Sequence, residues 1–296
     1  MSFHFKKLES PAKAVRRLCR EHIGEALGCL RNSRHPGAVH GVRKEIKKLR
    51  AIFRLVRGEI GRGIYRKAAK ALRKAADRLA APRDARVTLK AFESLAGRAA
   101  ARRFPEIQKT LQKHCRRETR RFRHDDSIAV ADQILRQINR RVGDLIIKAD
   151  GWAAIEPGLK QSYRRGQQAC ARVRQKPSPE NFHEWRKHVK NLWHYLRLLC
   201  PDWPAEARVL TDKLELLGEQ LGDDHDLGLL KQFVAERCAG QTKEAAALNQ
   251  LIASRQEKLR SAALKLGVRL YARTPAAIGR RLGQQWNAWR GETRRH

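Results

Sequence analysis

The stretch HGVRKEIK at residues 40–47 appears again, with nearly the same basic residues, as HEWRKHVK at residues 183–190. Each copy has a histidine, an arginine–lysine pair and a further lysine at the same spacing. The second copy lies 143 residues after the first, and the correspondence continues from Arg54 to Arg197. A basic segment that occurs twice predicts two copies of one structural unit.

Each copy has the periodicity of an amphipathic helix. With about 100° of rotation per residue and His40 at zero, Arg43 lies at about −60°, Lys44 at about +40° and Lys47 at about −20°. The opposite sides of the two helices carry apolar residues: Val42, Ile46, Leu49, Phe53 and Val56, and Trp185, Val189, Leu192, Leu196 and Leu199. We therefore expect each helix to bury one face and to present a narrow basic stripe on the other.

The basic stripe opposes helix stability. Like charges four residues apart, such as Arg43 and Lys47, destabilise a helix by about 0.2–0.5 kcal/mol. A sequence that needed only solubility would place glutamates between them. The same unfavourable arrangement at equivalent positions of both copies therefore favours an anionic ligand.

Composition points to a large helical protein that attracts polyanions. The chain has 296 residues with 42% hydrophobic residues, enough for real cores and too many for a disordered chain. Lysine and arginine number 65 against 30 acidic residues, which gives a formal net charge of +35. This field attracts nucleic acid, inorganic polyphosphate or an anionic membrane, and it does not distinguish among them.

Helical periodicity and helix-ending residues predict an all-α fold. The expected helices lie near residues 11–30, 38–57, 64–80, 82 onward, 105–123 and 127–147, and near 159–173, 180–200, 205–221, 226–238, 243–266 and 275–289. The second half repeats the order of the first. We predict two pseudo-symmetric helical bundles from an internal duplication, residues 1–150 and residues 151–296.

A second pair of matching positions supports the duplication. Arg83 and Asp84 correspond to His225 and Asp226, 142 residues later. The pattern around residues 221–227 predicts a turn between helices, with Gly222 ending one helix and Asp223 or Asp224 capping the next. Alternatively, Asp84 and Asp226 orient the basic side chains of the repeated helices from behind.

Several classes of site are not expected. The six cysteines have no C-x-x-C spacing, and most are expected to be buried as small apolar side chains. His183 and His188 lie about 140° apart around a helix, so they cannot share a metal ion on one face. No metal and no cofactor is therefore predicted. No apolar run approaches the length of a membrane span, and the N-terminus does not resemble a signal peptide, so a cytoplasmic location is the default.

The paired basic helices, the run LGDDHD at residues 221–226 and the segment YRRG at residues 163–166 resemble the CHAD family, the conserved-histidine α-helical domain. The resemblance covers nearly the whole chain. It implies two helical bundles with a basic cleft between them, and binding of inorganic polyphosphate. It also implies a possible association with polyphosphate-rich granules. The acidic enzyme domain that precedes many CHAD domains has no counterpart in this sequence.

We predict that the chain binds inorganic polyphosphate and is not an enzyme. The side chains expected to contact the polymer are His40, Arg43, Lys44, Lys47, Arg50, Arg54, Arg83, Tyr163, Arg164, His183, Arg186, Lys187, Lys190, Arg197 and His225. Arginine can form paired hydrogen bonds with phosphoryl oxygens, and lysine acts as a point charge. Asp84 and Asp226 are expected to orient these side chains rather than to contact the polymer.

Two other functions remain open. The same basic surface could serve a non-specific nucleic-acid-binding or granule-associated adaptor protein, although most aromatic residues fall on apolar faces. Alternatively, His40 or His183 could act as the nucleophile of a phosphotransfer or phosphatase enzyme. The arginine-rich run at residues 116–123 wraps around its helix, which is typical of a solvated surface, and it could also extend the binding track.

Overall fold

A computed structural model describes residues 3–32, 37–97, 100–123, 125–199, 205–238 and 242–291. All regular secondary structure in these ranges is helical, which confirms the predicted all-α class. The helices are α1 (Pro11–Arg31), α2 (Ala38–Leu55), α3 (Arg62–Arg78), α4 (Ala81–Ala96), α5 (Ala100–Arg103), α6 (Pro105–Arg123), α7 (Ser127–Arg141), η2 (Gly151–Ala154), α8 (Glu156–Gln175), α9 (Pro179–Leu199), α10 (Ala205–Arg237), α11 (Thr242–Leu270) and α12 (Pro275–Arg290).

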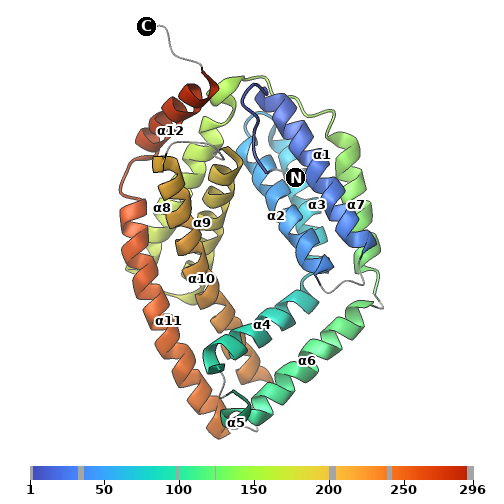
Figure 1. The fold of residues 1–296 in the computed structure, drawn as a ribbon, viewed down its shortest axis with the longest axis vertical. Helices are drawn as coiled ribbons and strands as arrows, with labels where there is room; N and C mark the ends of the chain where they lie inside the picture. Colours follow the sequence, from blue (N-terminus) through green and yellow to red (C-terminus); the bar gives the residue numbers. More distant parts are fainter. Residues whose placement is uncertain are drawn as a thin grey trace.

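The two halves have the same order of packing partners. Helix α1 packs on α2, and α2 on α3. In the second half α8 packs on α9, and α9 on α10 (Figure 1). The two basic helices, α2 and α9, contact each other where the halves meet. This arrangement agrees with an internal repeat, whereas an exact symmetry axis and a boundary at residue 150 stay predictions.

The apolar faces of the repeated helices are buried, as the helical wheel predicts. Val42, Ile46 and Leu49 of α2 and Trp185 and Val189 of α9 all belong to the larger of two hydrophobic cores. Burial of these side chains fixes the rotation of both helices. Their basic stripes must therefore face the space between the halves and the solvent.

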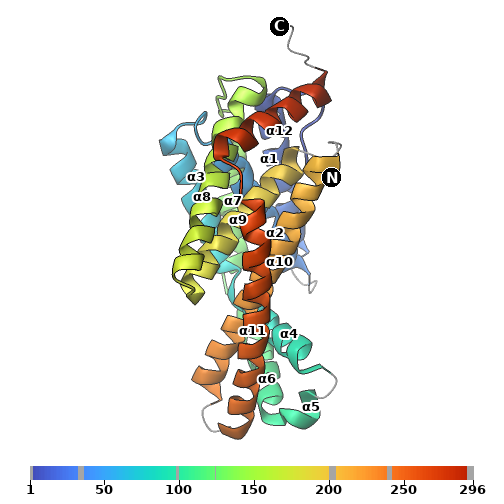
Figure 2. The ribbon, with the colours of Figure 1, turned by 90° about the vertical axis from the view of Figure 1, so that its left-hand side faces the viewer.

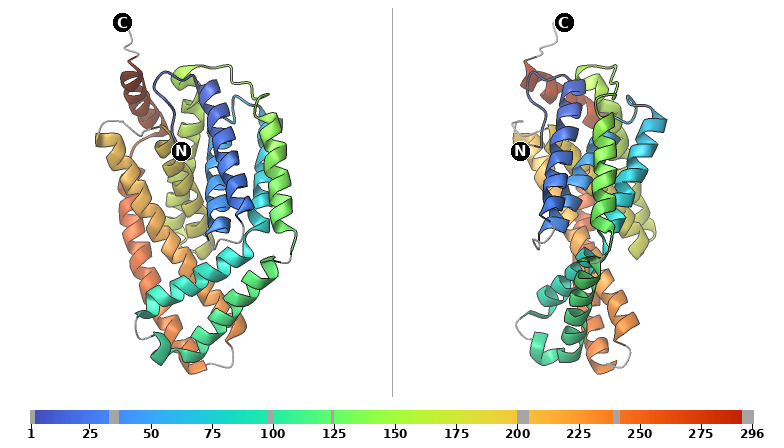
Figure 3. Two further views of the ribbon diagram at one scale, coloured as in Figure 1. Left: turned by 45° about the vertical axis from the view of Figure 1, so that its right-hand side comes forward. Right: turned by 90° about the vertical axis from the view of Figure 1, so that its right-hand side faces the viewer.

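A smaller core lies at one end of the molecule. It is built from α4, α6 and the adjoining parts of α10 and α11, with Phe92, Phe104, Leu230 and Leu248 fully or almost fully buried. Figure 3 shows this lobe beneath the larger group of helices. Both cores combine residues from the first and second halves.

The predicted turn at Gly222 was wrong, because α10 continues through it. Asp224 is buried rather than capping a helix. Its carboxylate accepts a hydrogen bond from Arg260 Nε at 2.7 Å, and its carbonyl accepts one from Gln256 at 3.0 Å. Packing against α9 and α11 thus outweighs the local preference of glycine for a helix end. In the first half the chain does break, between α3 and α4, where Pro82 occupies the first turn of α4.

Five of the six cysteines lie in the described part of the chain. Cys19, Cys170 and Cys238 are buried, Cys29 and Cys115 are half-buried, and all five are free thiols. Cys200 lies outside the described residues.

None of the described helices has the length and apolar character needed to cross a membrane. The described part of the chain also contains no group of three or more metal-ligating side chains.

Candidate anion-binding site

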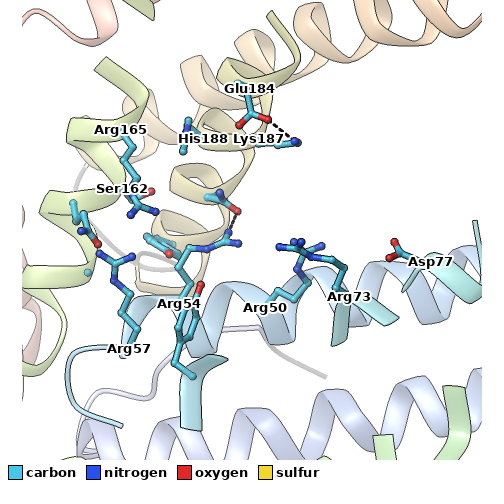
Figure 4. A pocket seen from close by; sticks show the side chains of 15 residues that line it. Arg50, Arg54, Arg57, Arg73, Asp77, Ser162, Arg165, Glu184, Lys187 and His188 are labelled. Atoms are coloured by element: carbon cyan, nitrogen blue, oxygen red, sulfur yellow. Dashed lines mark hydrogen bonds and ion pairs between the residues drawn. The ribbon is translucent and has the colours of Figure 1, made fainter. Parts of the chain in front are cut away.

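A pocket of about 560 Å³ lies where α2, α3, α8 and α9 come together (Figure 4). We call it the anion pocket. Its lining residues are Arg50, Arg54, Arg57, Tyr65, Arg73, Asp77, Gly158, Gln161, Ser162, Arg165, Glu184, Lys187, His188, Asn191 and Tyr195. Six of these side chains are arginine or lysine and only two are carboxylates. The pocket therefore has an excess of positive charge.

Helical spacing delivers the arginines of α2 to the pocket. Arg50 and Arg54 are four residues apart, so they share one face of α2, and Arg57 follows in the turn just after the helix ends at Leu55. Figure 4 shows them in a row along α2, continued by Arg73 from α3. Arg165 reaches the same space from α8. Four separate helices thus converge on one cationic surface.

The arginines of the anion pocket lack acidic partners. Among the described residues, no carboxylate lies within ion-pair distance of Arg50, Arg54, Arg57, Arg73 or Arg165. Arg54 donates to the amide oxygen of Asn191, and Lys187 pairs with Glu184 at 2.5 Å. Unpaired cations in a partly enclosed space repel one another and favour an anion between them.

Burial and the repulsion between neighbouring arginines both lower the pKa values of guanidinium groups in the pocket. Burial, and then the charges of Arg54 and Arg73, lower the pKa of Arg50. Burial, and then Arg165, lower the pKa of Arg57 in the same way. Arginine stays protonated despite such shifts, because its ordinary pKa exceeds 12. The pocket is therefore positively charged at every physiological pH.

Two hydroxyl groups at the pocket have no hydrogen-bond partner among the described residues. They belong to Ser162 and Tyr195, and both oxygen atoms are buried. Buried polar atoms without a partner are rare in folded proteins and need an explanation. A ligand that accepts hydrogen bonds would satisfy both.

A second group of cations lies farther along α2 and α9, and we call it the cassette cluster: Arg43, Lys47, Arg83, Arg186 and Lys190. Partial burial, and then the charges of Arg83 and Arg186, lower the pKa of Lys47 to about 8. Burial, and then Arg186, lower the pKa of Lys190. Arg43 donates to the carbonyl of Ala76 on α3, one residue before Asp77 of the anion pocket. The two groups of cations therefore adjoin each other.

The equivalent residues Arg43 and Arg186 share an unusual feature. Each has a buried Nε atom with no hydrogen-bond partner among the described residues. Asp84 and Asp226 are the acidic groups whose charges act most strongly on Arg43 and on Arg186, respectively. Asp84 itself pairs with Arg83 at 2.9 Å. Both aspartates thus lie close enough to influence the cluster, although their predicted orienting role stays a prediction.

The predicted histidines lie at the edge of the cassette cluster. The Nδ1 atoms of His183 and His225 are 3.2 Å apart, so at least one ring is neutral. Burial, and then Arg186, lower the pKa of His225 to about 4. Burial, and then Lys187, lower the pKa of His183. His40 is largely exposed. The part of its ring that is shielded from water, and then the charge of Lys47, lower its pKa.

Four further predicted contact residues lie outside the anion pocket. Tyr163 is buried in the core, where its hydroxyl donates to the carbonyl of Leu270 at 3.0 Å, so it cannot contact a ligand in the pocket. Arg164 is exposed outside the pocket, which its neighbour Arg165 lines instead. Arg197 packs on Trp193, with 4.8 Å between its guanidinium carbon and the ring centre. Lys44 is exposed and does not line the pocket.

Sequence reasoning missed three arginines and one histidine of the pocket: Arg57, Arg73, Arg165 and His188. Arg57 could have been found, because it lies only three residues after Arg54, at the end of the predicted basic helix. The others could not, since their place in the pocket depends on how α3, α8 and α9 pack around α2. The arginine-rich run of α6 does not line the pocket, and Phe122 within it packs in the larger core.

The comparisons with known proteins agree with this architecture. The model of the CHAD domain family matches residues 14–235. The crystal structure of the CHAD domain from the plant Ricinus communis superposes with a TM-score of 0.70 at 16% identity, covering 93% of this chain and 96% of that one. PptA from Streptomyces chartreusis superposes with a TM-score of 0.63 at 15% identity, covering 88% and 99%. A search of curated protein sequences gives no significant match. This chain belongs to the CHAD domain family.

Proposed function

We propose that this protein binds inorganic polyphosphate without covalent chemistry, through the anion pocket and the cassette cluster. The observation that carries the proposal is the set of arginines in one pocket that have no acidic partner among the described residues. The CHAD resemblance supports the same ligand. Polyphosphate offers closely spaced charged oxygens, which match guanidinium groups on adjacent helical turns.

A linked anion suits this surface better than a single phosphate. The pocket and the cluster present many cations in succession along α2 and α9. Only a polymer can contact them all, and each contact after the first is intramolecular. Affinity should therefore rise with chain length and should fall steeply with salt.

Nucleic acid fits the surface less well. Among the described residues no tryptophan, phenylalanine or tyrosine is exposed, so unstacked bases find no aromatic platform. Non-specific contact with the nucleic-acid backbone stays possible because of the high net charge. We propose that such contact is weaker than polyphosphate binding at physiological salt.

Binding without turnover is also part of the proposal. The rings of His183 and His225 are tilted by 40°, and their Nδ1 atoms interact with each other. Burial and then the neighbouring cations lower the pKa of both rings, which disfavours their cationic forms. Location in the cytoplasm or on granules stays a prediction.

Isothermal titration with long-chain polyphosphate tests the proposal. We expect saturable binding to the polymer and none to orthophosphate at the same phosphate concentration. A parallel incubation with and without Mg²⁺ should release no orthophosphate and leave no acid-labile phosphate on the protein. Equal binding of orthophosphate, or steady phosphate release, would contradict the proposal.

A further inference from the structure

One end of the anion pocket is closed by the packing of α8 on α2. A side chain at Gly158 would place its Cβ only 1.9 Å from the carbonyl oxygen of Leu55, so the backbones of the two helices touch there. Beside this contact, the Glu59 carboxylate accepts hydrogen bonds from the backbone amides of Lys148 and Ala149, at 3.2 and 3.0 Å. The contact between Gly158 and Leu55 thus borders the pocket at the end where Arg57 lies, two residues after Leu55 (Figure 4).

The other end of the pocket leads onward to more cations. Asp77 lies at this end, beyond Arg50 and Arg73 (Figure 4). The Arg43 side chain, a member of the cassette cluster, reaches the neighbouring Ala76 carbonyl. A bound polymer can therefore leave the pocket in this direction and continue along α2, whereas at the opposite end the backbones of α2 and α8 are in contact.

The closed end has the donors that the end of a phosphate chain requires. Arg57 and Arg165 lie close enough for their charges to interact, and the Ser162 hydroxyl beside them has no hydrogen-bond partner among the described residues. A terminal phosphate carries about 1.5 to 2 negative charges at neutral pH and has three free oxygens, as a phosphate monoester has. An internal phosphate of the chain has one fewer free oxygen and a single charge. The closed end therefore matches the terminal group better.

We propose that the anion pocket captures the terminal phosphate of a polyphosphate chain at its Arg57–Arg165 end, with the adjoining phosphates extending toward the cassette cluster. The inference rests on the proposed function and makes it more specific. It assigns to this protein the recognition of chain ends rather than of any position along the polymer. Each linear chain then offers two sites, whatever its length.

The stoichiometry of saturated complexes tests this inference. The full chain is mixed in excess with two narrow size fractions of linear polyphosphate, one roughly ten times longer than the other, and the molar mass of the complexes is measured by light scattering. We expect two protein molecules per polymer chain in both fractions. A number of bound proteins that grows in proportion to chain length would overturn end capture and leave polyphosphate binding intact. No complex with either fraction would overturn the proposed function itself.

Chemical capping of the chain ends provides a second readout. Conversion of both terminal phosphates to phosphoramidates of a small neutral amine removes one terminal oxygen and its charge, and we expect affinity to fall at least tenfold. Arg57→Gln with Arg165→Gln should abolish the difference between free and capped chains. The matched control, Arg43→Gln with Arg186→Gln, should weaken both chains by the same factor. Equal affinity of the native protein for free and capped chains would overturn the inference, and circular dichroism checks that each variant folds.

Discussion

The two sides of the α2–α9 pair differ in how their basic side chains are paired. On the side of α3 and α8, the arginines that surround the anion pocket have no acidic partner among the described residues. On the side of α1, Glu45 accepts hydrogen bonds from His22 at 2.6 Å and from Lys48 at 2.9 Å. The Phe3 ring covers this second side, 5.1 Å from the His22 ring and 5.3 Å from the Lys48 ammonium.

The difference lies in one carboxylate and one aromatic ring. Glu45 neutralises the cations around it, and Phe3 excludes water, so we call this region the filled side. His188, which occupies the position equivalent to Glu45 in the second copy, lies in the anion pocket and supplies no negative charge. Net charge therefore does not distinguish the two sides. The residue at this helical position does, because it supplies an acid on one side and none on the other, and we propose the side without the acid as the binding site.

The largest expected effect comes from removing the cations of the open side. Arg54→Ala, Arg57→Ala and Arg165→Ala together should reduce affinity for long polyphosphate at least 100-fold, because hydrogen bonds to charged groups contribute about 1.5–3 kcal/mol each. The same number of changes on α6, Arg116→Ala, Arg120→Ala and Arg121→Ala, should cost less than about fivefold. Titration calorimetry at fixed salt measures both. An equal loss in the two triple variants would show that the wrong surface has been assigned.

The filled side should behave in the opposite way. Glu45→Ala leaves His22 and Lys48 without their buried partner, so we expect a loss of about 3 kcal/mol in unfolding free energy. For a chain of this size the melting temperature should fall by about 5 °C. Affinity for polyphosphate, measured well below that temperature, should not change. The exposed Glu25→Ala is the matched control and should shift melting by less than about 1 °C. A large loss of polyphosphate affinity in Glu45→Ala would contradict the claim that the filled side contributes to stability and not to binding.

Acid should destabilise the protein through His194, whose ring contacts Phe3 on the filled side. Burial, and then Lys47 and Lys190, lower its pKa to about 3, well below the usual 6.5. As the pH falls below 6.5, the unfolded chain takes up a proton that the folded protein does not, so stability decreases with falling pH. Between pH 7 and pH 5, His194→Gln should lose about 2 kcal/mol less unfolding free energy than the native protein. Urea unfolding at the two pH values measures this difference, and parallel losses would contradict the pKa assignment.

The smallest expected effect separates stability from binding within the cassette cluster. Lys47 is crowded by Arg83, Arg186 and Arg43, which makes its charge unfavourable in the absence of a ligand. Lys47→Met should raise the melting temperature by about 2 °C and should weaken polyphosphate binding about threefold. Lys67→Met on the exposed surface of α3 should change neither quantity measurably. A drop in melting temperature for Lys47→Met would argue that this lysine stabilises the fold.

The helical periodicity of the sequence was enough to predict the helices that carry the candidate site. It was not enough to predict which helices pack together to form the pocket. The apolar residues of α2 and α9 lie at helical spacing, so their burial and the rotation of the basic stripes followed from the sequence. Arg50, Arg54 and Lys187 were found by this route. Arg73 and Arg165 were not, because they come from helices whose own periodicity does not indicate where they pack.

Two errors have a common physical origin. Tyr163 was predicted to contact the ligand because of its place in a family-like segment, yet its ring packs on Tyr271 in the core. Gly222 was predicted to end a helix, yet α10 continues because both of its flanks pack on other helices. In each case tertiary packing decided the outcome. Neither the side-chain type nor the local spacing contains that information.

A competition titration tests the central claim most directly. Labelled long-chain polyphosphate is bound to the protein at about 150 mM salt, where weak surface electrostatics are screened, and is challenged with single-stranded DNA at equal phosphate concentration. We predict that the DNA displaces little polymer from the native protein, and that the Arg54, Arg57 and Arg165 triple variant retains almost no polymer before the challenge. Complete displacement by DNA at equal phosphate concentration, or undiminished binding by the triple variant, would contradict the assignment of the anion pocket to polyphosphate.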